Sequence, residues 1–191
     1  GKAARVKELS DEEKILLSDL NLLTTKPVLY ICNVDEAGIA NGNSFVDQVK
    51  KIAEEERAGV LVLCAKLESE IAELEDADER AMFLEDAGLK EPGVNFLIRA
   101  AYKLLNLSTY FTAGEKEVRA WTIPTGVKAP QAAGVIHSDF EKGFIRAEVI
   151  AYNDFVKFGS EAACKENGKM QVEGKEYTVK DGDIMHFRFN V

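Results

Sequence analysis

Two short apolar runs constrain the fold of this chain more than any other feature of its sequence. Val28–Cys32 and Val60–Cys64 are rich in β-branched residues and do not alternate with polar ones, which is typical of strands buried on both faces. The segment between them has apolar residues at helical spacing, namely Phe45, Val49, Ile52 and Ala53. Ser44 can cap this helix and Gly59 suits its end. Strand, helix and strand predict a βαβ unit, and therefore a parallel sheet with a right-handed crossover.

Polar loops follow both predicted strands. Asn33-Val34-Asp35-Glu36 comes directly after the first run, and Ala65-Lys66 comes directly after the second. Open α/β sheets bind ligands beyond the carboxyl ends of their strands, and the carboxyl ends of parallel strands meet at one edge. We therefore expect these two loops to lie together and to carry the function of the first half.

Helices are predicted for the rest of the first half. Ser10-Asp11-Glu12-Glu13 predicts a capping box that opens a short helix through Leu20. Further helices are expected over residues 68–75, 78–87 and 94–105. The last has an apolar face formed by Val94, Leu97, Ile98, Ala101, Leu104 and Leu105. The acidic residues between Glu68 and Glu91 are read as solvated helix faces rather than as a metal site.

From Ser108 onward the pattern changes to short strands and turns. Strands are expected over residues 109–112, 118–123, 145–150, 177–179 and 184–189, with a turn at Gly114-Glu115-Lys116. Pro130 suits the first turn of a helix that begins near Ala129. A hairpin, a helix and further strands predict a compact β-grasp sheet, with Trp121 in its core.

The two halves of the chain differ in net charge. The chain has 24 basic and 33 acidic residues and a net charge of −9. Residues 106–191 hold 11 and 12 of these, which leaves 13 and 21, or −8, for residues 1–105. The first half is therefore not expected to bind nucleic acid nonspecifically.

Cysteine, histidine and hydropathy patterns exclude other classes. No apolar run is long enough to cross a bilayer and the start lacks a signal-peptide core, so a cytoplasmic location is expected. Three widely spaced cysteines, Cys32, Cys64 and Cys164, argue against a disulfide framework, and the first two are read as small buried hydrophobic residues. His137 and His186 are isolated, so solvated or capping roles are expected rather than metal binding.

Several long stretches of the sequence are similar to a known family. They are Thr109–Gly114 (TYFTAG), Glu117–Pro124 (EVRAWTIP), Ala129–Gly134 (APQAAG), Ile136–Glu148 and Val179–Val191. In these stretches the second half resembles the TGS domain of YchF-type Obg-like ATPases. Leu23–Tyr30 followed by Asn33–Glu36 resembles the strand and base-recognition loop of the same family.

The resemblance implies a domain plan and a function. Residues 1–26 would end an inserted helical coiled-coil region, residues 27–105 would be the second half of a P-loop nucleotide domain, and residues 106–191 would be a β-grasp TGS domain. The implied ligand is ATP, with Mg²⁺ held by a half that this chain lacks. The implied partners are the ribosome or RNA, for which Lys116, Arg119, Lys128, Lys142 and Arg146 are candidate contacts.

The loop Asn33–Glu36 implies a preference for ATP over GTP. GTPases have Asn-Lys-x-Asp here, because the Asp carboxylate accepts hydrogen bonds from guanine N1–H and from its 2-amino group. Adenine offers neither donor, and Glu36 displaces the carboxylate by one methylene. Asn33 would steady the loop beside the base, and Val34 would offer backbone and apolar contact. Asp35 leaves an alternative open, since a loop shift of one residue could bring it to the base.

Lys66, in the second loop, would lay its stem along the base or would be an ordinary surface lysine. No G-x-x-x-x-G-K-[ST] run occurs in the 191 residues, so this chain alone is not expected to hydrolyse ATP. The alternative function is a stand-alone TGS binding module without nucleotide chemistry.

Overall fold

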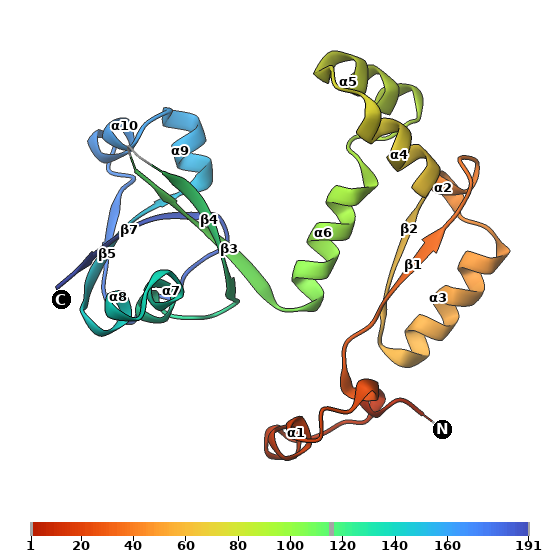
Figure 1. The fold of residues 1–191 in the computed structure, drawn as a ribbon, viewed down its shortest axis with the longest axis horizontal. Helices are drawn as coiled ribbons and strands as arrows, with labels where there is room; N and C mark the ends of the chain where they lie inside the picture. Colours follow the sequence, from red (N-terminus) through yellow and green to blue (C-terminus); the bar gives the residue numbers. More distant parts are fainter. Residues whose placement is uncertain (1, 115–116, 191) are drawn as a thin grey trace. The chain divides into compact units, whose positions relative to one another are not determined.

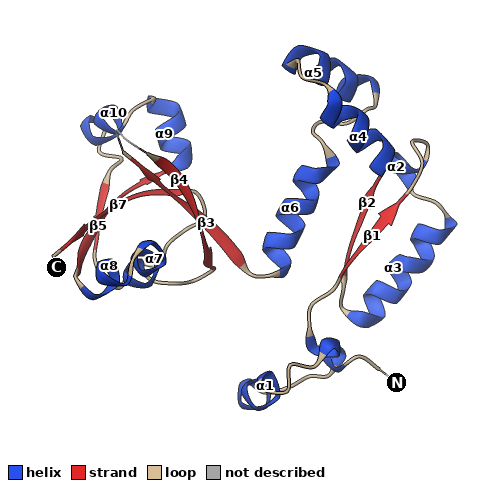
Figure 2. Cartoon of the chain, in the orientation of Figure 1, coloured by secondary structure: helices blue, strands red, loops and turns tan. Residues whose placement is uncertain are grey.

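The computed structural model describes residues 2–114 and 117–190, and the chain divides into two compact units, residues 1–105 and 106–191. Figure 1 shows the first unit in red to green and the second in green to blue, and Figure 2 separates their helices from their strands. Each unit combines helices with a sheet. The first sheet is parallel, and the second contains both parallel and antiparallel pairs.

The first unit contains the predicted βαβ arrangement. Its elements are η1 (Ala4–Val6), α1 (Asp11–Ser18), η2 (Leu23–Thr25), β1 (Leu29–Asn33), α2 (Gly38–Asn41), α3 (Ser44–Glu56), β2 (Gly59–Leu63), α4 (Ala65–Glu73), α5 (Ala77–Asp86) and α6 (Gly93–Leu104). β1 and β2 pair in parallel, with Leu29 opposite Gly59 and Asn33 opposite Leu63. The parallel sheet is therefore confirmed.

Burial in this unit differs from the prediction. The strands are not buried on both faces: every residue of β2 is half-buried, and Ile31 in β1 is 49% exposed. In α3 the buried residues are Val46 and Ala53, whereas Phe45 is 74% exposed. Part of the apolar face expected for α6 is exposed too, at Val94, Ile98 and Leu105. Among the described residues β1 and β2 pair only with each other, so neither strand has a second strand beside it.

The residues at the helix ends determine where α1 and α3 begin and end. The capping box of α1 is present, because Ser10 accepts from the Glu13 N–H and Glu13 accepts from the Ser10 N–H. The cap of α3 is Asn43, whose side chain accepts from two backbone N–H groups, and not Ser44. α3 ends at Arg57 in the left-handed region (φ 53°), while Gly59 begins β2.

The second unit is a five-stranded sheet with helices on both faces. Its elements are β3 (Leu107–Ala113), β4 (Val118–Pro124), α7 (Ala129–Ile136), α8 (Ser138–Lys142), β5 (Phe144–Ala151), α9 (Tyr152–Phe158), α10 (Glu161–Glu166), β6 (Gln171–Glu173) and β7 (Asp183–Phe189). The strand order is β4-β3-β7-β5-β6. β3 and β7 are parallel neighbours, and the other pairs are antiparallel.

Alternate residues of the strands face two separate cores. Tyr110 and Met185 face the cluster that includes three alanines of α7, and the Tyr110 hydroxyl donates to the Ala132 carbonyl at 2.9 Å. Burial raises the pKa of Tyr110. Phe111 and Ile184, one residue along, belong to a cluster under α9 and α10. Figure 1 shows α7 and α8 on one side of the sheet and α9 and α10 on the other.

Two expectations for this unit need correction. No strand forms at residues 177–179; Thr178 instead makes an isolated bridge with Lys128, and the Val179 N–H donates to the Val127 carbonyl at 3.0 Å. This segment pairs with the start of α7 rather than with β7, because the Ala129 N–H also donates to the Tyr177 carbonyl, at 2.9 Å. Trp121 is half-buried at the margin of the core rather than within it.

The remaining expectations concern single residues. Cys64 and Cys164 are buried, but Cys32 is only half-buried. His137 caps α8 by accepting from the Asp139 N–H, and His186 is exposed. No helix in residues 2–114 and 117–190 has the length and apolar character that a bilayer crossing requires.

Candidate functional site

The loops that follow β1 and β2 meet at the carboxyl edge of the parallel sheet. The Val34 N–H donates to the Leu63 carbonyl at 2.9 Å, which extends the strand pairing by one bond. The Asn33 side-chain oxygen accepts from the Ala65 N–H at 2.9 Å. Asn33 thus joins the end of β1 to the first residue of α4, and the expected meeting of the two loops is confirmed.

The Asn33 contact satisfies a helix terminus. The first N–H groups of a helix have no partner within the helix. Cys64, at the cap position of α4, supplies no side-chain hydrogen bond to them. Asn33 supplies one from the neighbouring strand, so its side chain fixes where α4 begins relative to β1.

An ion pair makes the second link between the loops. The Lys66 ammonium lies 2.9 Å from Glu36 Oε1 and 3.6 Å from Glu70, one turn further along α4. The hydrogen bond from Lys66 to Glu36 raises the pKa of Lys66 above its ordinary value, and the charge of Glu70 adds to this. Glu36 and Lys66 are 57% and 72% exposed, so this polar pair is open to a ligand.

Asp35 serves the loop itself. Its carboxylate accepts from the Gly38 N–H at 2.9 Å, at the start of α2. A Cβ on Gly38 would lie 2.9 Å from the Val34 Cβ, closer than carbon atoms pack, so any larger residue would force the turn to shift. Val34 is buried beneath this turn at 9% exposure, which leaves its backbone rather than its side chain for a ligand. The turn therefore directs Glu36, and not Asp35, toward Lys66.

Two acidic residues of this region cap helices. The Glu68 carboxylate accepts from the Gly93 and Val94 N–H groups at 2.7 and 3.0 Å and so caps α6. Asp76 caps α5 in the same manner. In the described part of the chain no group of three or more His, Cys, Asp or Glu side chains is arranged to hold a metal ion.

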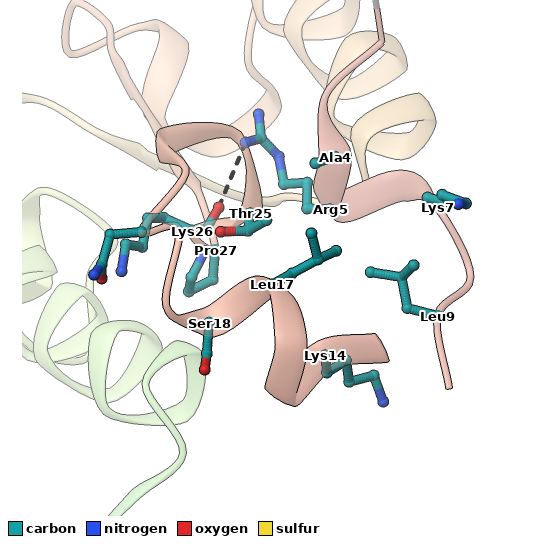
Figure 3. Close-up of a pocket in the computed structure, with 11 residues that line it drawn as sticks. Ala4, Arg5, Lys7, Leu9, Lys14, Leu17, Ser18, Thr25, Lys26 and Pro27 are labelled. Atoms are coloured by element: carbon teal, nitrogen blue, oxygen red, sulfur yellow. Dashed lines mark hydrogen bonds between the residues drawn. The ribbon is translucent and has the colours of Figure 1, made fainter. Parts of the chain in front are cut away.

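A separate hollow of about 490 Å³ lies in the N-terminal segment (Figure 3). In that view Leu9 and Leu17 point toward one another across it, and Lys7 and Lys14 lie at its border. Pro27, which also lines it, lies two residues before the start of β1. The hollow is therefore at the amino end of the sheet, opposite the loops that carry Asn33 and Lys66.

The four candidate contact cations that the structure describes are not gathered on one face. Arg119 lies over the Trp121 ring at 4.1 Å, on the face of the sheet that packs on α7. Arg146 faces the other side, directly opposite Arg188 of β7, and Arg188 pairs with Glu148 at 3.0 Å. Lys128 pairs with Glu176, and Lys142 ends α8. Lys116 lies outside the described residues.

Comparison with known proteins places these features in a family. The family model YchF-GTPase_C, described as "Protein of unknown function (DUF933)", matches residues 107–190. A Pasteurella multocida protein named "Ribosome-binding ATPase YchF" is 60% identical over 184 residues, which cover 96% of this chain and 50% of that protein. A Bacillus subtilis protein of the same name is 56% identical over 192 residues, 100% of this chain and 52% of that protein. This chain belongs to the YchF family.

Solved structures agree with this assignment. The Schizosaccharomyces pombe YchF GTPase superposes with a TM-score of 0.85 at 36% identity, over 98% of this chain and 50% of that one. A GTP-binding protein from Pyrococcus horikoshii shares the fold, with a TM-score of 0.61 at 16% identity over 95% of this chain and 51% of that one. The chain thus spans about half the length of the YchF proteins it matches.

Two residues of the edge were not singled out from the sequence. Glu70 was one acidic residue among many, but its spacing of four from Lys66 on a helix indicates an i,i+4 pair. Gly38 ends the polar loop, and a glycine directly after Asp35-Glu36-Ala37 was a signal for a close backbone approach.

Proposed function

We propose that the edge formed by Asn33–Glu36 and Ala65-Lys66 reads the base of a nucleotide, and that it prefers ATP over GTP. The observation that carries the proposal is the double link between the loops, from Asn33 to Ala65 and from Lys66 to Glu36. It lies beyond the carboxyl ends of two parallel strands, where α/β sheets bind ligands. Relatives of this chain are named ribosome-binding ATPases, which supports ATP as the nucleotide.

The preference for adenine follows from the length and position of Glu36. Guanine is read by a carboxylate that accepts two N–H groups at once, and the extra methylene of Glu moves the carboxylate from that position. Asp35 has the shorter side chain, but its carboxylate is held by the Gly38 N–H. A guanine base would leave donors without acceptors, which is costly in a desolvated site.

Lys66 can contribute its aliphatic stem as well as its charge. Its α4 position lies beside the Asn33 loop, and a lysine stem can cover the face of a flat ring while the ammonium keeps its hydrogen bond to Glu36. We assign to the edge the residues Asn33, the backbone of Val34, Glu36, Ala65 and Lys66.

Phosphate chemistry would be supplied by other residues of the YchF protein. The 191 residues contain no P-loop sequence, whose backbone N–H groups and lysine hold phosphates and whose hydroxyl holds Mg²⁺. The described residues likewise offer no cluster for the ion. We therefore propose that the YchF protein hydrolyses ATP only where this chain is joined to such residues.

For residues 106–191 we propose a β-grasp TGS domain that contacts RNA or the ribosome. The strand order β4-β3-β7-β5-β6, with β3 and β7 parallel, and the packing of α7 on one face of the sheet support the β-grasp. The names of the relatives support a ribosomal partner, and hence work in the cytoplasm. Arg119 and Arg146 are exposed cations on opposite faces, so we expect one of the two faces to make the contact.

Nucleotide titration tests the base assignment. Fluorescently labelled ATP and GTP analogues are titrated into this chain and into a protein that joins it to the remaining half of the Pasteurella multocida relative, each with and without Glu36→Asp. The joined protein should prefer ATP. Glu36→Asp should shift that preference toward GTP by about fivefold to 150-fold, since one bidentate contact is worth roughly 1–3 kcal/mol. An unchanged preference would sink the base assignment and favour a TGS binding module without nucleotide chemistry.

A further inference from the structure

Lys66 stands between two carboxylates that come from different parts of the first unit. Glu36 belongs to the loop after β1, and Glu70 lies one helical turn beyond Lys66 on α4. The shorter contact is to Glu36 Oε1, at 2.9 Å against 3.6 Å for Glu70. The ammonium is therefore hydrogen-bonded to the residue that replaces the guanine-reading aspartate of GTPases.

This contact uses an oxygen that guanine would need. The bidentate reading of guanine requires both carboxylate oxygens, one for N1–H and one for the 2-amino group. With Oε1 accepting from Lys66, one of the two lone pairs of that oxygen is taken, and the ammonium charge lies beside it. A guanine base must then displace the ammonium or place one of its own N–H donors beside it on the same oxygen, and either outcome weakens its binding.

Adenine makes no such demand. It has no N1–H and no 2-amino group, and its 6-amino group can donate to one oxygen alone. The Lys66–Glu36 pair can therefore persist while adenine is bound. The two bases differ in whether they compete with Lys66 for the carboxylate.

We propose that Lys66 is a specificity residue that disfavours guanine by occupying the Glu36 carboxylate. This rests on the proposed function, because it assumes that the base lies at this edge. It is a separate obstacle from the added methylene of Glu36: one acts through the position of the carboxylate, and the other through its occupancy. Building repulsion or competition against the wrong ligand is a general route to specificity.

The size of the effect follows from the exposure of the pair. Glu36 and Lys66 are 57% and 72% exposed, and exposed ion pairs contribute modestly. We expect loss of the Lys66 charge to improve GTP binding relative to ATP by about twofold to fivefold. The shift from Glu36→Asp should be larger, and the two changes together should favour GTP more than either alone.

Lys66→Met tests the proposal, because methionine keeps an apolar stem and removes the ammonium. Binding of labelled ATP and GTP analogues is measured on the joined protein described above. Lys66→Arg keeps the charge and should leave the preference close to the original. Lys50→Met is the matched control: Lys50 is 55% exposed on α3 and lies 3.9 Å from Asp47, so it loses an equivalent surface charge elsewhere in the unit.

The outcomes separate this inference from the function on which it rests. A rise in relative GTP affinity with Lys66→Met, and none with Lys50→Met, supports the inference. If Glu36→Asp shifts the preference but Lys66→Met does not, the edge reads the base and the role of Lys66 is wrong. If neither substitution shifts it, the base assignment fails and the inference fails with it.

Discussion

Single residues at the carboxyl edge have divided roles. Asn33 and Asp35 hydrogen-bond to backbone N–H groups and build the loops, whereas Glu36 and Lys66 bond to each other and remain exposed. A polar side chain that satisfies a backbone donor is costly to remove, while an exposed ion pair can exchange its partner for a ligand at little cost. This division explains why Asp35, although closer in type to the guanine-reading aspartate, is not the residue we assign to the base.

The Lys66–Glu36 ion pair is expected to depend on pH in the alkaline range. Because hydrogen bonding to Glu36 raises the pKa of Lys66 in the folded chain, the pair is fully formed below the ordinary lysine pKa. Its contribution is lost as the pH rises through the raised value. Glu36→Gln should lower the pKa of Lys66 toward that of an ordinary lysine, as followed by NMR titration of its side chain. A titration that Glu36→Gln leaves unchanged would show that the pair does not form in solution.

Gly38 should be the most sensitive position of the loop. Its substitution by alanine places a Cβ 2.9 Å from the Val34 Cβ, so the turn must shift. We expect a loss of about 1–3 kcal/mol in the free energy of unfolding of the first unit, as for other overpacked sites. Gly174→Ala is the control, because a Cβ there meets no atom within 4 Å. Equal effects in denaturant titrations of the two variants would contradict the steric argument.

At the scale of helices and strands, the residue types predicted helix ends and strand pairing but did not predict which side chains are buried. The capping box at Ser10, the parallel pairing of β1 with β2 and the meeting of their loops all follow from residue types and spacing. The exposure of Ile31 and Phe45 could not be predicted, because burial depends on which strands and helices surround an element. In the same way, the sequence did not show that residues 177–179 would pair with residues 127–129 rather than with β7.

The start of α3 offers a direct test of the local chemistry. Asn43 accepts from the Phe45 and Val46 N–H groups, and Ser44 is the first residue of the helix. Asn43→Ala should therefore destabilise the first unit by about 1 kcal/mol, while Ser44→Ala should have a much smaller effect. Denaturant unfolding followed by circular dichroism measures both. The reverse order would restore Ser44 as the cap, as its position before the apolar residues suggested.

For the whole molecule, two compact units with separate cores and unequal charge suggest separate tasks. Residues 1–105 hold most of the net negative charge and the proposed base edge, and residues 106–191 hold the sheet that we propose contacts RNA or the ribosome. The resemblance to YchF proteins covers both units, so neither task depends on an isolated motif. The proposed site could be predicted from the sequence as a pair of loops, but the bonds that set Asp35 apart from Glu36 required the structure.

The central claim is that the two loops of the first unit read an adenine base. NMR spectra of the 191-residue chain, labelled with ¹⁵N and titrated with ATP and then with GTP, test it most directly. We predict that ATP shifts the backbone signals of Asn33, Val34, Glu36, Ala65 and Lys66, that GTP shifts them less at equal concentration, and that residues 117–190 do not respond. Shifts confined to the second unit, or equal responses of the loops to both nucleotides, would contradict the account.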